Sequence, residues 1–246
     1  MIYGINPVME AIKIDRDCLE KIVVMKSKAG RPVQEILHMA ARKGIPIEFR
    51  EKAYLEQLAP RDSHQGIIGL CKDYSYADVD AVIRNRHASL NRDLILILDG
   101  ITDPQNLGSL VRTAHCLGAN GVIIPEHRAA AMTASAVKVS AGAAYYIPVA
   151  MVSNLANTME YLKTKGFWIY GAHASAGRDI RTLNFDEKVA LVMGSEGKGI
   201  RDLVKKKCDF LLSVPMVGKI DSLNVSVAAG ITIYEILHKQ DTLQTQ

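Results

Sequence analysis

The first segment with residues suited to chemistry is NLGSLVRTA at positions 106–114, which follows an apolar run and a Gly/Pro turn. A loop that enters a helix beyond the end of a parallel strand presents free N–H groups to an anion. Arg112 stands among apolar neighbours, and arginine is rarely buried unless it is paired. Asn106 equally suits a helix N-cap, and a surface salt bridge explains Arg112 as well as a functional role does.

Two further segments place glycine and polar side chains after predicted strands. LVMGSEGKGI (191–200) runs from an apolar strand into a loop whose glycines let a ligand approach the backbone, beside one carboxylate, Glu196. A tight turn in which Glu196 favours a helix N-terminus is the alternative. PMVGKIDSLNVSVAAGI (215–231) brings Ser222 and Asn224 to the start of a helix of small residues, where either side chain also serves as a cap.

Alternating strands and helices must position these segments. The predicted elements of the larger, C-terminal part are strands at 94–98, 121–124, 166–170, 189–193 and 210–214, and helices near 106–117, 130–141, 154–165, 200–207 and 224–238. Apolar strands that alternate with helices predict a mostly parallel sheet covered on both faces. This α/β domain is assigned to residues 93–246.

The first 72 residues read as a separate small α/β domain. Its predicted elements are strands at 19–25, 45–49 and 66–71 and helices at 31–43 and 53–58. The polar stretch 73–92 includes a short helix at 77–86 and is predicted to be a linker. The fold class is therefore α/β, with a small N-terminal domain and a larger C-terminal one.

Composition excludes several classes of protein. With 246 residues, 48% hydrophobic and 23% charged, the chain buries a real core, which excludes disorder. It has no apolar run of membrane-spanning length and no signal peptide at its N-terminus, so we expect a cytoplasmic protein. The four cysteines are far apart, so we expect buried thiols and no metal site. A net charge of +4 permits a polyanionic partner without requiring one.

Taken together, NLGSLVRTA, LVMGSEGKGI and PMVGKIDSLNVSVAAGI resemble the three ordered motifs of the SpoU/TrmH branch of the SPOUT RNA methyltransferases, over roughly residues 93–240. The opening Tyr3-Gly-Ile-Asn-Pro-Val and the stretch Ser63-His-Gln-Gly66 resemble the substrate-binding domain of the bacterial 23S rRNA (guanosine-2′-O)-methyltransferases. Val217 departs from the small residue often found after the Pro-Met pair, and we expect this change to affect packing only.

The resemblance implies a C-terminal domain with a deep trefoil knot that binds S-adenosyl-L-methionine and forms a homodimer through the knotted region. The active site then takes residues from both subunits. By motif position, the implied catalytic residues are Asn106, Arg112, Glu196, Ser222 and Asn224. The implied cofactor-binding residues are Met193, Gly194, Val214, Met216 and Leu223. No metal is implied.

The implied reaction is 2′-O-methylation of a ribose, a guanosine in 23S ribosomal RNA. RNA rather than DNA follows because only RNA has a 2′-hydroxyl. We interpret Arg112 as an electrostatic stabiliser of the developing oxyanion, because a guanidinium is effectively never deprotonated in proteins. Candidate phosphate contacts in the first domain are Arg42, Lys43, Arg50 and Arg61, although ordinary surface charge explains them equally well.

Three other functions remain open from the sequence. One is a tRNA 2′-O-methyltransferase of the same branch. Another is a catalytically silent RNA-binding or ribosome-assembly factor, which the intact set of catalytic residues disfavours. A generic nucleotide-binding protein is a third, but the chain lacks the G-x-G-x-x-G and Walker patterns that such proteins use.

Overall fold

The computed structural model describes residues 1–14, 19–26, 30–59, 64–71, 73–86, 92–219 and 222–243. Contacts divide the chain into two units, Met1–Tyr74 and Ser75–Gln246, and each is described here by itself. The predicted domain limits, 1–72, 73–92 and 93–246, stay a prediction. Within the predicted linker, residues 79–84 form a helix whose Val82 lies in the core of the larger unit.

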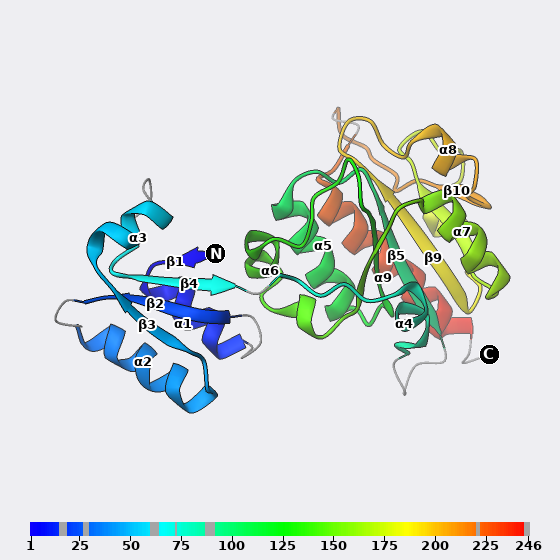
Figure 1. The fold of residues 1–246 in the computed structure, drawn as a ribbon. Helices are drawn as coiled ribbons and strands as arrows, with labels where there is room; N and C mark the ends of the chain where they lie inside the picture. Colours follow the sequence, from blue (N-terminus) through cyan, green and yellow to red (C-terminus); the bar gives the residue numbers. More distant parts are fainter. Residues whose placement is uncertain are drawn as a thin grey trace. The chain divides into compact units, whose positions relative to one another are not determined.

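The smaller unit is a four-stranded sheet with the order β1-β4-β2-β3, in which only β2 and β3 pair in parallel (Figure 1). Its elements are β1 (Ile2–Tyr3), α1 (Ile5–Ile14), β2 (Leu19–Met25), α2 (Arg31–Lys43), β3 (Ile47–Arg50), α3 (Lys52–Leu58) and β4 (Ile67–Cys71). Helices α1 and α2 share one hydrophobic cluster with the sheet, and α3 packs in another.

The predicted helix 31–43 shows how local sequence sets an element of this unit. Proline at the first turn lacks an N–H that the helix would leave unpaired, and Val33, Ile36 and Ala40 form its buried face. Gly44 ends the helix with a φ of 66°, and its N–H donates to carbonyl groups of the last turn.

The larger unit is a six-stranded sheet with the order β10-β8-β9-β5-β6-β7, and all of its strand pairs are parallel. The strands are β5 (Asp93–Asp99), β6 (Gly121–Pro125), β7 (Val149–Val152), β8 (Trp168–Ala172), β9 (Lys188–Gly194) and β10 (Phe210–Leu212). The α-helices are α4 (Val79–Arg84), α5 (Pro104–Cys116), α6 (Ala134–Val139), α7 (Leu155–Thr164), α8 (Asp202–Lys205) and α9 (Val225–Leu243), and two 3₁₀ turns are η2 (Ala143–Tyr145) and η3 (Ile180–Thr182).

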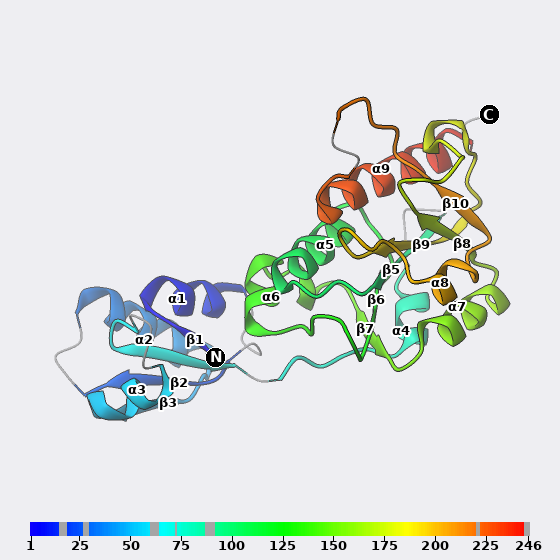
Figure 2. The same cartoon turned by 90° about the horizontal axis from the view of Figure 1, so that it is seen from above.

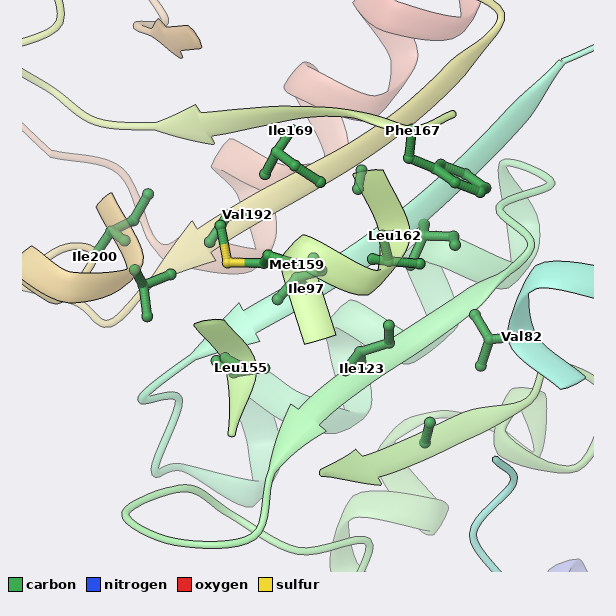
Figure 3. Close-up of a cluster of buried hydrophobic side chains, with 14 residues drawn as sticks. Val82, Ile97, Ile123, Leu155, Met159, Leu162, Phe167, Ile169, Val192 and Ile200 are labelled. Carbon is green, nitrogen blue, oxygen red and sulfur yellow. The ribbon is translucent and has the colours of Figure 1, made fainter. Parts of the chain in front are cut away.

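Helices cover both faces of this sheet. Every residue of β5 is buried, as expected for a central parallel strand. On one face, Ile95 and Ile97 of β5 share a cluster with Met159 and Leu162 of α7 and with Val82 of α4, much of which Figure 3 shows. Helices α5 and α9 lie side by side over the other face (Figure 2). The predicted α/β class is confirmed, whereas the trefoil knot stays a prediction.

Several expectations need correction. The sequence interpretation missed β1, α1 and β7. The helix expected near 106 begins at Pro104 and is capped by Asp103, whose side chain accepts a hydrogen bond from the N–H of Gln105, so Asn106 is not an N-cap. The cysteines were expected to be buried, but Cys116 is exposed, Cys71 and Cys208 are half-buried, and Cys18 lies outside the described residues. No helix within the described ranges is long and apolar enough to cross a membrane.

Candidate functional site

Strand order brings the three predicted segments to one edge of the larger sheet. Strands β5 and β9 are parallel neighbours, with Asp99 opposite Gly194 at their carboxyl ends. The loop after β5 leads into α5, which carries Asn106, and the loop after β9 carries Glu196. The carboxyl edge of a parallel sheet is where ligands bind in such folds, because loops diverge there.

Glu196 joins these loops to the start of α9. Its Oε1 accepts hydrogen bonds from Asn106 Nδ2 at 3.2 Å, from Asn224 Nδ2 at 2.8 Å and from the backbone N–H of Val225 at 3.1 Å. Asn224 Nδ2 also donates to Asn106 Oδ1 at 2.9 Å. A carboxylate at the first turn of α9 is further favoured by the helix dipole. The side chains of the three motifs therefore form one polar cluster.

Asn224 also caps α9, which is the alternative role that its position at the start of a helix predicted. Its Oδ1 accepts hydrogen bonds from the N–H of Ser226 at 3.0 Å and from the Ser226 hydroxyl at 2.5 Å. The carboxylate of Glu196 also lies at a helix N-terminus, as the alternative predicted. The helix is α9, however, and not the helix that follows the Glu196 loop in the sequence. Capping thus accounts for part of this geometry, but it does not explain why Asn106, from another helix, joins the cluster.

The glycine loop, residues 194–199, has its shape because its two ends pass very close together. Ser195 and Gly199 exchange two backbone hydrogen bonds of 3.1 and 2.8 Å. A Cβ placed on Gly194 would lie 2.1 Å from the carbonyl carbon of Gly199, so no other residue fits there without moving the loop. Gly197 and Gly199 have φ values of 80° and 66°, which favour glycine.

A buried carboxylate anchors the far end of this loop. Asp99, at the end of β5, is fully buried, and it accepts hydrogen bonds from the backbone N–H of Arg201 at 2.8 Å and from its Nε at 2.6 Å. The Arg201 guanidinium also forms an ion pair with Asp99 at 2.6 Å. Sequence reasoning assigned no role to Asp99, although a carboxylate that ends an apolar strand requires a partner.

A cavity of about 340 Å³ opens beside the cluster. All five residues predicted to bind the cofactor line it, and so do Glu196 and Ser222 of the predicted catalytic set. The lining residues that the sequence reasoning missed come mainly from the end of β8 and from α9: Ala172, His173, Ala174, Ser175, Val225, Ala228 and Thr232. Its volume falls within the range typical of small-molecule sites.

Arg112 is not part of this cluster within one chain. It lies on α5 six residues after Asn106 and is exposed. It forms no hydrogen bond or ion pair with any residue that the structure describes. Across the same described ranges, no group of three or more His, Cys, Asp or Glu residues is placed to hold a metal ion.

Comparison with known families covers both units. Residues 93–234 match the SpoU rRNA Methylase family, and residues 1–77 match the family described as RNA 2′-O ribose methyltransferase substrate binding. The YacO protein of Bacillus subtilis, named as a TrmH family tRNA/rRNA methyltransferase, is 41% identical over 98% of this chain and 96% of its own length. A Staphylococcus saprophyticus protein with the same family name is also 41% identical, with the same coverage.

Solved structures share this fold. The SpoU methyltransferase AviRb from Streptomyces viridochromogenes is 22% identical, with a TM-score of 0.74 over 100% of this chain and 91% of its own. Its complex with the cofactor AdoMet is 20% identical and gives a TM-score of 0.72 over 98% of this chain and 90% of its own. Because the match of the methylase family covers more than half of the chain and close relatives span nearly all of it, the chain belongs to the SpoU/TrmH family of RNA methyltransferases.

Proposed function

We propose that this protein transfers a methyl group from S-adenosyl-L-methionine to the 2′-oxygen of a ribose, at a guanosine in 23S ribosomal RNA. The observation that carries the proposal is the cluster of Asn106, Glu196 and Asn224 at the edge of a ligand-sized cavity. Family membership supports the reaction class. The resemblance of the N-terminal sequence to the 23S rRNA subfamily supports the substrate.

The cavity fits the proposed cofactor. Met193, Val214 and Leu223 give it apolar walls, and the glycine loop brings free backbone close to a ligand. Polar groups lie at the Glu196 end and on the wall after β8. Apolar walls with a few placed polar groups are typical of cofactor sites. When bound, this cofactor supplies an electrophilic methyl group on a sulfonium, so the protein has to position the reactants and stabilise charge.

Side chains of the protein position the ribose and stabilise the developing charge. Asn106 and Asn224 hold Glu196 and present amide groups to the ribose. Ser222 lies on the wall of the same cavity. Arg112 stabilises the charge that develops on the 2′-oxygen, because a guanidinium keeps its proton and acts electrostatically.

A homodimer supplies Arg112 to this site. Arg112 is exposed and lies on α5, beside α9, whose residues Val227, Ile231 and Tyr234 form an exposed stripe with spacings of four and three residues. Large apolar side chains exposed in a row are typical of a surface that another protein covers. We assign this stripe to the dimer that the family resemblance implies, with each active site shared between two subunits.

The N-terminal unit binds the RNA in this proposal. Arg42 is exposed, whereas Lys43 donates to backbone carbonyls of Ile12 and Lys13 and is therefore already engaged. Arg50 forms an ion pair with Glu48 and lies 5.1 Å from the centre of the Tyr54 ring. Arg61 lies outside the described residues. Arg42 is therefore the strongest of these candidates for a phosphate contact, because Lys43 and Arg50 already have partners in this unit.

Methylation of RNA from cells that lack this activity tests the proposal. Purified protein is incubated with radiolabelled cofactor and either total ribosomal RNA or total tRNA, and the labelled nucleotide is mapped. We expect label on a 2′-oxygen in 23S rRNA. Label in tRNA alone would establish the tRNA alternative, which the tRNA/rRNA names of the relatives keep open. Absence of label, together with no cofactor binding at near-millimolar concentration, would identify a silent RNA-binding factor.

A further inference from the structure

A second polar group lies on the cavity wall that follows β8. His173, just after β8, lines the cavity. Its Nε2 lies 3.2 Å from the ammonium nitrogen of Lys205, on α8. Neither residue belongs to the three sequence motifs. No carboxylate in the described ranges forms an ion pair with Lys205, so this cationic side chain has no anionic partner there.

The two ring nitrogens of His173 each face a donor, and the contact of Nδ1 favours one tautomer. Nδ1 of His173 accepts a hydrogen bond from the backbone N–H of Ser175 at 3.2 Å. A neutral imidazole has one donor and one acceptor, so the tautomer that accepts from Ser175 carries its proton on Nε2. The ammonium of Lys205 also has donors only. In that tautomer Nε2–H and the ammonium of Lys205 are both donors 3.2 Å apart, and an oxygen placed between them accepts from both.

The ring is held in position before any ligand arrives. The backbone N–H of His173 donates to the carbonyl of Leu212 at 2.9 Å, which ties it to the end of β10. On its other side the ring lies against Gly199, where an added Cβ would be 3.7 Å from Cδ2. The glycine loop that carries Glu196 thus also supports the ring. A preorganised donor loses little entropy when it binds a ligand.

We propose that His173 and Lys205 bind the carboxylate of the methionyl part of S-adenosyl-L-methionine. This assignment rests on the proposed function, and it follows from charge: the carboxylate is the only anionic group of that cofactor, and Lys205 brings a positive charge to His173 on the cavity wall. Hydrogen bonds from charged donors to a carboxylate are shorter and stronger than neutral ones.

The test compares two ligands that differ by this one group. Decarboxylated S-adenosylmethionine keeps the sulfonium, the amine and the adenosine but lacks the carboxylate. Isothermal titration calorimetry measures the affinity of both ligands for the wild-type protein and for Lys205→Met and His173→Gln. We expect each substitution to weaken the binding of S-adenosylmethionine by roughly ten- to a hundredfold, which corresponds to the loss of one charged hydrogen bond. We expect the affinity for the decarboxylated ligand to change by less than about twofold.

Lys207→Met is the matched control, because Lys207 lies two residues further along the chain and pairs with Glu160 at 3.1 Å instead of facing His173. We expect its affinity for both ligands to equal that of the wild type. Equal losses for the two ligands, or no loss for either, would overturn the assignment while leaving the proposed function intact. A wild-type protein that binds neither ligand would instead refute the proposed function. Thermal melts of both variants establish that they are folded.

Discussion

At the scale of single residues, Glu196 is the group to which the three motifs converge. Glu196→Ala leaves two side-chain amides and the N–H of Val225 without this acceptor. Because Glu196 is exposed, water replaces the lost partner, and we expect the free energy of unfolding to fall by only about 1 kcal/mol. We expect the methylation rate to fall by about a hundredfold or more, because the amides lose their alignment. Urea unfolding and a methylation assay measure the two effects.

Glu196→Gln serves as the control, since glutamine keeps an acceptor oxygen of the same reach but has no charge. We expect its activity to lie between those of the wild type and the alanine variant. Full activity of Glu196→Ala would show that the side chain only caps α9.

Also at the residue scale, Cys208 links stability to pH. Burial, helped by the charge of Asp209, raises the pKa of its thiol from 9.0 to about 12. The unfolded chain ionises this thiol above pH 9 but the folded chain does not, so the stability it contributes is present below pH 9 and is lost as pH rises towards 12. We expect unfolding free energy between pH 9 and 10 to fall more steeply in the wild type than in Cys208→Ala, by up to about 1.4 kcal/mol per pH unit. Parallel curves from urea unfolding at several pH values would contradict this.

At the scale of elements, the sequence predicts the helices and strands whose limits are marked by residues within or next to them. The strand predicted at 19–25 and the helix predicted at 31–43 have the observed limits, because an apolar run and a Pro/Gly pair of end signals mark them. Helix α1 was not predicted, and its Pro7 lies in the first turn, where proline is tolerated. Strand β7 was missed because VAMV is short and follows a proline.

The element most sensitive to substitution is the loop between β9 and α8. Arg201→Met removes the guanidinium from a fully buried carboxylate, Asp99. Among the residues that the structure describes, only the backbone N–H of residue 201 then remains as a donor to it. The Arg201 side chain is 46% exposed, so the loss is smaller than for a fully buried pair, at about 2 kcal/mol for a buried acceptor that loses its partner. We expect this loss in urea unfolding, and Asp99→Asn in the same chain restores part of it because the uncompensated charge is gone.

Lys13→Met is the comparison for this prediction. Lys13 pairs with Glu10 at 3.0 Å with both side chains more than half exposed. Exposed pairs contribute about 0 to 1 kcal/mol. If both substitutions had the same small effect, burial of Asp99 would not be what makes the Arg201 pair important.

At the scale of the whole molecule, the order of the strands in the sheet determines which segments meet at the site, and sequence patterns do not reveal that order. The three motifs were recognised as a set from their order along the chain, and their side chains do meet around Glu196. The sequence did not predict that His173 and Ser175 line the cavity. They do so because β8, which they follow, lies between β9 and β10 in the sheet. Hydrophobic periodicity reports which faces are buried but contains no information on which strands are neighbours.

The proposed sharing of each site between two subunits makes a prediction at this scale. Arg112→Ala and Glu196→Ala are each expected to be inactive. If Arg112 acts in the site of the other subunit, a mixed dimer of the two variants contains one site with both residues intact. Random exchange of subunits then restores roughly a quarter of the wild-type activity. If Arg112 acts within its own chain, every site of the mixed dimer lacks one residue, and mixing restores nothing. Mixing after mild denaturation and renaturation, followed by the methylation assay, distinguishes the two cases, and each variant refolded alone is the control.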